Sequence, residues 1–244
     1  MTLRYSSGLR NHLANGGSFK NAFQNGRIEV YTGAQPASAD AAVAGTLLCT
    51  ITNNNGAHTA EVSATATLTL NSGAGGSLDT LTLDGVSLIA GAVPYNTSLS
   101  QTASDIADAI NDHETYLQVK AAAVGAVVTI TAPRGAGATA NGLVLAKTET
   151  TISSTAVNMG SGVAGVTAVN GLKFGTAAAG AIAKLAAQVW EGTNVATGTA
   201  GWYRFYGSVA DAGALDSAEL YIREDGAIST SGQQFNFAGS TSFT

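Results

Sequence analysis

The stretch Leu78-Asp-Thr-Leu-Thr-Leu-Asp84 decides the fold class of this chain, together with the run Val86-Ser-Leu-Ile89 that follows it. In the first run Leu81 and Leu83 alternate with threonine and aspartate, which is the period of a β-strand with one buried face. The second run continues the apolar pattern after a one-residue break at Gly85. The two runs therefore predict a pair of consecutive strands.

A helix and two further strands are predicted after this pair. Thr102 and Asp105 form a start signal close to a capping box, and the residues that share one helical face after it are apolar: Ala103, Ile106, Ala109 and Ile110. The runs 116–119 and 127–130 return to a period of two. The stretch 78–133 thus predicts a small β–β–α–β–β module.

The composition favours a β-rich structural protein. The 244 residues include 30 glycines and three prolines, and only 11% are charged, whereas soluble domains average about a quarter. The hydrophobic content of 45% suffices for a core, but no apolar run approaches the roughly 18 residues that span a bilayer, and no signal peptide is visible. The single cysteine, Cys49, excludes an internal disulfide framework and suits folding in a reducing cytosol.

The residue composition and patterning of the sequence change at about residue 60 and again at about residue 171. We predict a discontinuous β-rich body formed by residues 1–60 and 172–244, and an inserted α+β domain formed by residues 61–171. The expected fold is mainly β, with a β-sandwich-like body that begins with a short helix at 7–14 and a second one capped by Ser18 and closed by Asn25-Gly26. Residues 153–171 are expected to be linker or irregular edge, and 219–223 to form a hairpin with 228 onward across Asp225-Gly226.

The predicted strand 199–209 carries aromatic residues on both faces. Trp202 and Tyr206 share one parity, and Tyr203 and Phe205 share the other. A single thin core cannot cover both pairs, so we expect one face to be buried by a neighbouring subunit.

The charges of the N-terminal segment suggest a second subunit interface. Residues 1–27 hold four basic and no acidic side chains, whereas residues 28–119 hold nine acidic side chains and no Lys or Arg. Solvated faces are the commoner explanation of such runs. The alternative is that this segment docks on the acidic part of an adjacent copy, burying the apolar residues of its two helices: Leu9, Leu13, Phe19 and Phe23.

No residue pattern predicts catalysis, a metal or a cofactor. Gly160–Gly165 matches GxGxxG but lacks the strand–helix context of a dinucleotide site. His12, His58 and His113 lack metal-ligand spacing, and Cys49 alternates with Leu47 and Ile51 as a core residue would. Asp105, Asp108 and Asp112 share a helix face that is more simply a solvated one. Dispersed basic residues also argue against nucleic-acid binding, so we expect a protein that is not an enzyme.

Several segments resemble a family of virion proteins of tailed bacteriophages. The resemblance lies in Ser6–Asn11, Phe19–Phe23, Arg27–Ala42, Gly45–Ile51, Val189–Ala200 and Tyr203–Phe205. It covers the body, roughly residues 1–57 and 172–244, whereas the middle is similar to the strand–helix–strand modules of phage tail and flagellin proteins. The resemblance implies a structural tail, head-decoration or connector protein, folded in the bacterial host cytoplasm and then placed in the virion. Its implied partners are other copies of itself and neighbouring virion proteins.

A binding module of a tail fibre that recognises a host-surface glycan is the alternative function. A carbohydrate site favours exposed aromatic rings flanked by amide or carboxylate side chains. The inserted domain offers only Tyr95 and Tyr116, which argues against this alternative. The position in the particle, head or tail, is left open.

Overall fold

The protein is mainly β, with 39% of its residues in strands and 13% in helices, which confirms the predicted fold class. The computed structural model describes residues 2–113, 119–232, 235–236 and 241–243. These form two compact units: unit 1 comprises Met1–Glu61 and Ala168–Thr244, and unit 2 comprises Val62–Thr167. The bounds differ from the predicted ones by one residue at the first junction and by four at the second.

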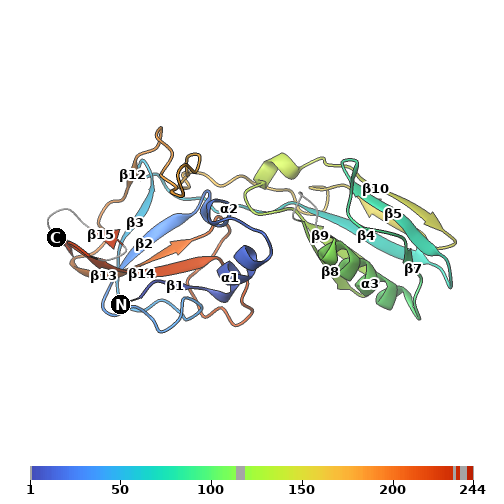
Figure 1. Ribbon diagram of the computed structural model, residues 1–244, viewed down its shortest axis with the longest axis horizontal. Coiled ribbons are helices and arrows are strands. Elements are labelled where there is room, and N and C mark those ends of the chain that lie inside the picture. The colour runs from blue at the N-terminus through green and yellow to red at the C-terminus, as the bar shows by residue number, and fades with distance from the viewer. Residues whose placement is uncertain (1, 114–118, 233–234, 237–240, 244) are drawn as a thin grey trace. The chain divides into compact units, whose positions relative to one another are not determined.

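Unit 1 is built on one antiparallel sheet of long strands with short strands at its margins (Figure 1). Its strands are β1 (Arg4–Tyr5), β2 (Arg27–Thr32), β3 (Leu47–Asn53), β12 (Trp190–Glu191), β13 (Gly198–Tyr206), β14 (Arg223–Ser229), β15 (Phe235–Asn236) and β16 (Ser242–Phe243). The path runs β1-β14-β13-β2-β3-β12, while β15 pairs with β14 and β16 with β13. β15 is parallel to β14, and the other pairings are antiparallel.

The first two helices form where the sequence predicts them. Helix α1 (Ser7–Ala14) is capped by the hydroxyl of Ser6, which accepts from the Leu9 backbone N–H, and α2 (Phe19–Phe23) is capped in the same way by Ser18. Each cap satisfies one of the backbone donors that a helix leaves free at its N-terminus.

The described residues of unit 1 hold one sheet, and not the two packed sheets of the expected sandwich. Its apolar face is covered in part by α1, α2 and residues 172–190, which contribute Leu9, Phe23 and Leu172 to the buried cluster. A β-bulge where β2 meets β3 turns Leu48, and not Leu47, into that cluster.

The predicted hairpin across Asp225-Gly226 does not form, because both residues lie in the middle of β14. Asp225 is held there by a buried ion pair with Arg204. Gly226 lies under the ring of Tyr203, where an added Cβ would be 2.4 Å from Cε1 of that ring. The glycine therefore serves close packing and not a turn.

Unit 2 contains two four-stranded sheets whose buried residues belong to one core. One sheet has the order β10-β5-β6 with β7 also paired to β5, and the other has the order β11-β4-β9-β8. The strands are β4 (Thr65–Ser72), β5 (Ser77–Leu83), β6 (Val86–Ser87), β7 (Val93–Pro94), β8 (Lys120–Val124), β9 (Val127–Thr131), β10 (Leu145–Thr150) and β11 (Ser153–Val157), with a 3-10 turn η1 at Gly137–Ala140. The two-sheet packing expected of the body thus occurs in the insertion.

Helix α3 (Leu99–Asp112) lies along β8 and β9 (Figure 1) and buries Ala103, Ile106 and Ile110 in this core. Its N-cap is Ser98 and not Thr102, so the helix begins one turn earlier than predicted. Thr102 lies inside the helix, and its hydroxyl donates to the Ser98 carbonyl.

Two further predictions differ from the structure or lie outside it. Residues 153–157, expected to be linker or irregular edge, form β11, which pairs along β4. The predicted strand 116–119 falls almost entirely outside the described residues, and the strand that pairs with β9 begins at Lys120.

Candidate functional site

Most residues of the predicted subunit interface lie in the interior of unit 1. Leu9, Phe23, Trp202 and Tyr206 are fully buried, and Tyr203 and Phe205 are each 5% exposed. Leu13 and Phe19 are half-buried at the margin of the core. Six of the eight residues are therefore unavailable to a neighbouring subunit.

The apolar face of β13 packs on α2, on β15 and on the segment after Leu172. The rings of Phe205 and Phe23 stack with centroids 4.4 Å apart, and Tyr203 lies 5.5 Å from Phe235. Phe174, in the segment after Leu172, lies 6.0 Å from Phe205. This face provides the core that the sequence predicts.

The other face of β13 is covered by charged residues of the same chain, which corrects the expectation that a neighbour covers it. Arg204 forms two hydrogen bonds of 2.7 and 2.8 Å with the Asp225 carboxylate, and both side chains are fully buried. Arg223 makes the same bidentate contact, at 2.7 Å, with Asp211. Burial alone would lower the pKa of Arg204, but the Asp225 carboxylate outweighs burial and raises it.

These two ion pairs anchor loops over the sheet. Arg204 also donates to the Ala41 carbonyl, and Arg223 to the carbonyls of Ala39 and Asp40. Asp211 belongs to residues 207–222, and the three carbonyls belong to residues 33–46. We call the side of the sheet under these two segments the charged face.

The N-terminal segment is part of the fold and not a free arm. β1 pairs with β14, and the Ser6 hydroxyl both caps α1 and accepts from the Arg223 backbone N–H. Its basic side chains have partners within the chain: Arg4 and Lys20 donate to backbone carbonyls, and Arg27 forms an ion pair with Glu29 at 2.7 Å. The charge split of the sequence is thus satisfied in part within one copy.

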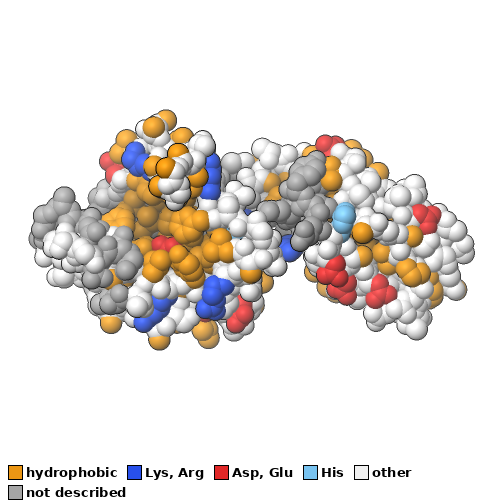
Figure 2. Space-filling model, in the orientation of Figure 1, with side chains coloured by type: hydrophobic (Ala, Val, Ile, Leu, Met, Phe, Trp, Pro, Cys, Tyr) orange, Lys and Arg blue, Asp and Glu red, His pale blue; other side chains and the backbone are white. Residues whose placement is uncertain are grey.

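Among the described residues, the helices and residues 172–190 leave part of the apolar face accessible. Figure 2 shows hydrophobic side chains gathered in a depression on one face of unit 1. Six half-buried residues pack against the core of unit 1, and we assign them to this region: Tyr5, Phe19, Ile182, Trp190, Phe235 and Phe243. We call this region the apolar hollow. An uncovered apolar surface of this kind is a mark of protein–protein contact sites.

One carboxylate lies among these apolar side chains. Glu224 in β14 is 7% exposed and accepts a 2.9 Å hydrogen bond from the Tyr203 hydroxyl. Its neighbour across the strand pair is Tyr5. None of the four ion pairs between described residues involves Glu224. Burial raises the pKa of its carboxyl, and the nearby charge of Asp225 raises it further.

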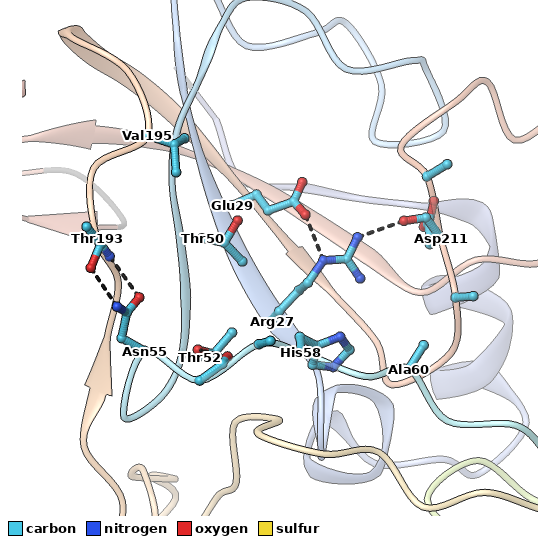
Figure 3. A pocket seen from close by; sticks show the side chains of 14 residues that line it. Arg27, Glu29, Thr50, Thr52, Asn55, His58, Ala60, Thr193, Val195 and Asp211 are labelled. Atoms are coloured by element: carbon cyan, nitrogen blue, oxygen red, sulfur yellow. Dashed lines mark hydrogen bonds and ion pairs between the residues drawn. The ribbon is translucent and has the colours of Figure 1, made fainter.

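A polar groove of about 610 Å³ opens on the charged-face side of β2 and β3 (Figure 3). Its lining comes from Arg27, Glu29, Thr50, Thr52, Asn55, Gly56, Ala57, His58, Ala60, Thr193, Val195, Ala210, Asp211 and Ala212. The charged groups in it are already engaged, since Arg27 bonds both Glu29 and the Asp211 carbonyl. Asn55 and Thr193 bond each other across the groove.

The groove lacks the parts of a catalytic site. A ring nitrogen of His58 lies 3.1 Å from the Asn25 carbonyl, and burial lowers the pKa of this imidazole. A general base needs a nucleophile or an acid within reach, and no described side chain pairs with His58 in that way. Among the described residues, no three His, Cys, Asp or Glu side chains gather as a metal ion would require.

The remaining sequence candidates have structural roles. Cys49 is buried in the core of unit 1, and burial raises the pKa of its thiol to about 11, which opposes nucleophilic use. Asp105 accepts from the side chains of Asn96 and Gln101 on the surface of α3. Gly160–Gly165 lies beyond β11, and no helix follows it in the described part of the chain.

The charged face and Glu224 were not found from the sequence. The sequence offered one signal for the charged face. Arg204 lies between two aromatic residues in a predicted strand, and Arg223 and Asp225 are two positions apart and would share a strand face. This signal shows which side chains share a face, but pairing across strands depends on the register of β13 with β14.

No protein-family model, no curated protein and no solved structure matches this chain. None of the helices in the described part of the chain has the length and apolar character needed to cross a membrane.

Proposed function

We propose that this protein is a structural component of a tailed-bacteriophage virion, in the tail or as a head-decoration or connector protein, that acts by self-assembly or by docking on neighbouring virion proteins. Folding would take place in the host cytoplasm before assembly. The resemblance of the body segments to that family supports the class of protein. The proposal requires no catalytic group, cofactor or metal.

The apolar hollow is the single observation that carries the proposal. A sheet normally buries its apolar face against a second layer, yet here the second layer consists of two short helices and an irregular segment that leave aromatic side chains accessible. Aromatic residues in a depression contribute strongly to the free energy of association when a partner covers them. The docking surface that we propose is therefore the hollow, which shares only Phe19 with the eight residues that the sequence suggested.

The glycan-binding alternative gains no support from the groove. Sugar rings stack on aromatic side chains, and none of the 14 residues that line the groove is Phe, Tyr or Trp. The half-buried aromatic side chains that pack against the core of unit 1 are instead assigned to the hollow, whose apolar character suits a protein surface.

The test is the association of the purified chain. We expect particles larger than the monomer in sedimentation velocity as the concentration rises, and regular rings, tubes or fibres in negative stain. Ile182→Gln, which alters a half-buried residue of the hollow, should weaken association while the unfolding temperature stays close to wild type.

A matched control uses the opposite side of the sheet. Leu215 is 67% exposed in the segment that covers the charged face, so Leu215→Gln should leave association unchanged. If the chain stays monomeric at every concentration, or if both variants behave alike, the hollow is not an assembly surface.

A further inference from the structure

The position of Glu224 constrains what can cover the apolar hollow. In the free protein its carboxylate has one hydrogen bond from Tyr203 and limited access to water. A partner that covers the hollow removes that water. A buried carboxylate without a hydrogen-bonding or charged partner is costly, so the covering surface must bring a donor.

A second hollow is a poor cover for the first. Two depressions that face each other leave their floors apart, so neither brings a hydrogen-bond donor close to Glu224. The hollow is bordered by lysines, since Lys20 lies between Phe19 and Phe23 in α2, and Lys184 forms a backbone bridge with Phe174. The partner surface is therefore one that projects into the hollow and tolerates lysines beside it.

The chain itself carries a surface of the required chemistry on β8. Lys120, Ala122 and Val124 alternate along one face of this edge strand and are exposed, with Val124 80% exposed. Ala121 and Ala123, on the other face, pack toward the core of unit 2. Lys120 takes part in none of the ion pairs between described residues.

The surroundings of β8 match the walls of the hollow in charge. Helix α3 packs against β8, and the Asn111 side chain bonds both polar groups of the Ala121 backbone. Asp108 and Asp112 are exposed on that helix. Residues 62–167 hold seven acidic and three basic side chains, a net charge of −4. Acidic side chains beside β8 thus complement the lysines beside the hollow.

We propose that β8 of a second copy docks in the apolar hollow, with Val124 against the aromatic side chains and Lys120 against the Glu224 carboxylate. This inference rests on the proposed function, since it names the partner of that same surface. The contact is heterologous: it joins unit 2 of one copy to unit 1 of the next. Such a contact closes into a ring or continues as a filament, according to the rotation it imposes.

A double-mutant cycle on the full chain tests the pairing, with dissociation constants from sedimentation velocity. Glu224→Gln keeps the side-chain size, and Lys120→Gln replaces the charge with a neutral polar group. Each should raise the dissociation constant by about tenfold or more, as expected for a close charge pair at an interface. The double variant should be no weaker than either single variant, because the second change removes nothing further.

Two controls separate this inference from the proposed function. Lys147→Gln also removes one positive charge from unit 2, but Lys147 pairs with Glu149 in the chain, so it should leave the dissociation constant unchanged. If Ile182→Gln weakens association but the Glu224 and Lys120 variants match Lys147→Gln, the hollow is an assembly surface and β8 is not its occupant. If the effects of the two single variants add in the double variant, the two side chains do not meet. A chain that remains monomeric overturns both proposals.

Discussion

The two faces of the sheet in unit 1 differ in how their buried charged groups are paired. On the charged face, Arg204 and Arg223 are fully buried, and each has a carboxylate and backbone carbonyls of the same chain as partners. On the apolar face, Glu224 is almost as deeply buried but has a tyrosine hydroxyl as its partner and no cation. The first face is complete within one copy. Among the described residues, the second is covered only in part and has no counter-charge for Glu224.

This difference teaches that burial alone does not distinguish an interior from an interface. Trp202 and Glu224 are both less than a tenth exposed. Trp202 lies on the face whose charged groups are paired within the chain, whereas Glu224 lies on the face where the carboxylate has no cationic partner among the described residues. Satisfied polar groups mark the closed face, and an unmatched carboxylate among aromatic side chains marks the open one.

The largest expected effect comes from breaking the charged face. Asp225→Asn leaves the Arg204 guanidinium buried without its counter-charge, so we expect a loss of about 3–5 kcal/mol in the free energy of unfolding of unit 1. Both tryptophans lie in this unit, so their fluorescence in a urea titration reports its unfolding.

The control for this prediction is the more accessible pair on the same face. Arg27 and Glu29 have side chains 13% and 14% exposed, and Glu29→Gln retains a hydrogen-bond acceptor for Tyr31. Its cost should be smaller than that of Asp225→Asn, because both side chains keep some access to water and Arg27 retains the Asp211 carbonyl as a partner. Equal losses in the two variants would contradict the account of a closed, charge-paired interior.

A smaller effect is expected from crowding the apolar face. Gly226→Ala places a methyl group 2.4 Å from the Tyr203 ring, and we expect a loss of about 1–3 kcal/mol as the ring moves. Gly175→Ala is the matched change, since its added Cβ would meet only carbonyl oxygens 3.8 Å away. The same urea titration distinguishes them, and a neutral Gly226→Ala would show that the ring does not pack as described.

The smallest effect on stability is expected at Glu224 itself. Burial raises the pKa of this carboxyl, and the facing groups, Tyr203 and Tyr5, are themselves neutral at pH 7. A raised pKa in the folded state means that ionisation costs stability at neutral pH, and that the cost disappears as the pH falls through the folded-state pKa. Glu224→Gln should therefore be within about 1 kcal/mol of wild type, and more stable at pH 7.

The pH dependence provides the check on that prediction. The difference in the free energy of unfolding between Glu224→Gln and wild type should shrink as the pH is lowered from 7 toward the ordinary pKa range of a glutamate. A gap that stays constant, or that grows in acid, would mean that the Glu224 carboxylate is already well satisfied in the free chain.

Local patterns predicted the elements of this fold but not their partners. The period of two around Leu81 and Leu83 gave β5, and Ser18 gave the start of α2, because each signal depends on neighbours in sequence. The Asp225-Gly226 pair predicted a turn that does not form. The same dipeptide suits the middle of β14, because Asp225 forms an ion pair with Arg204 and Gly226 leaves room for the ring of Tyr203. The body was expected to be β-sandwich-like, yet alternation along a strand does not reveal what covers either face.

The candidate site was missed for a related physical reason. Six of the eight aromatic and aliphatic residues chosen as an interface are those most favourable to bury, and the chain buries them itself. The residues that remain accessible, such as Ile182 and Trp190, lie in or near irregular segments without a periodic signal. Glu224 follows Arg223 directly in the sequence, and only the pleat of β14 places the two side chains on opposite faces.

Acrylamide quenching of the two tryptophans tests the central claim most directly, because they lie on opposite faces. Single-tryptophan variants, Trp202→Phe and Trp190→Phe, isolate the signal of Trp190 in the hollow and that of the fully buried Trp202. At low concentration Trp190 should be quenched and Trp202 protected. As the concentration rises and the chain assembles, Trp190 should become protected while Trp202 does not change. Trp190 that remains equally quenchable in the assembled state would contradict the assignment of the apolar hollow as the assembly surface.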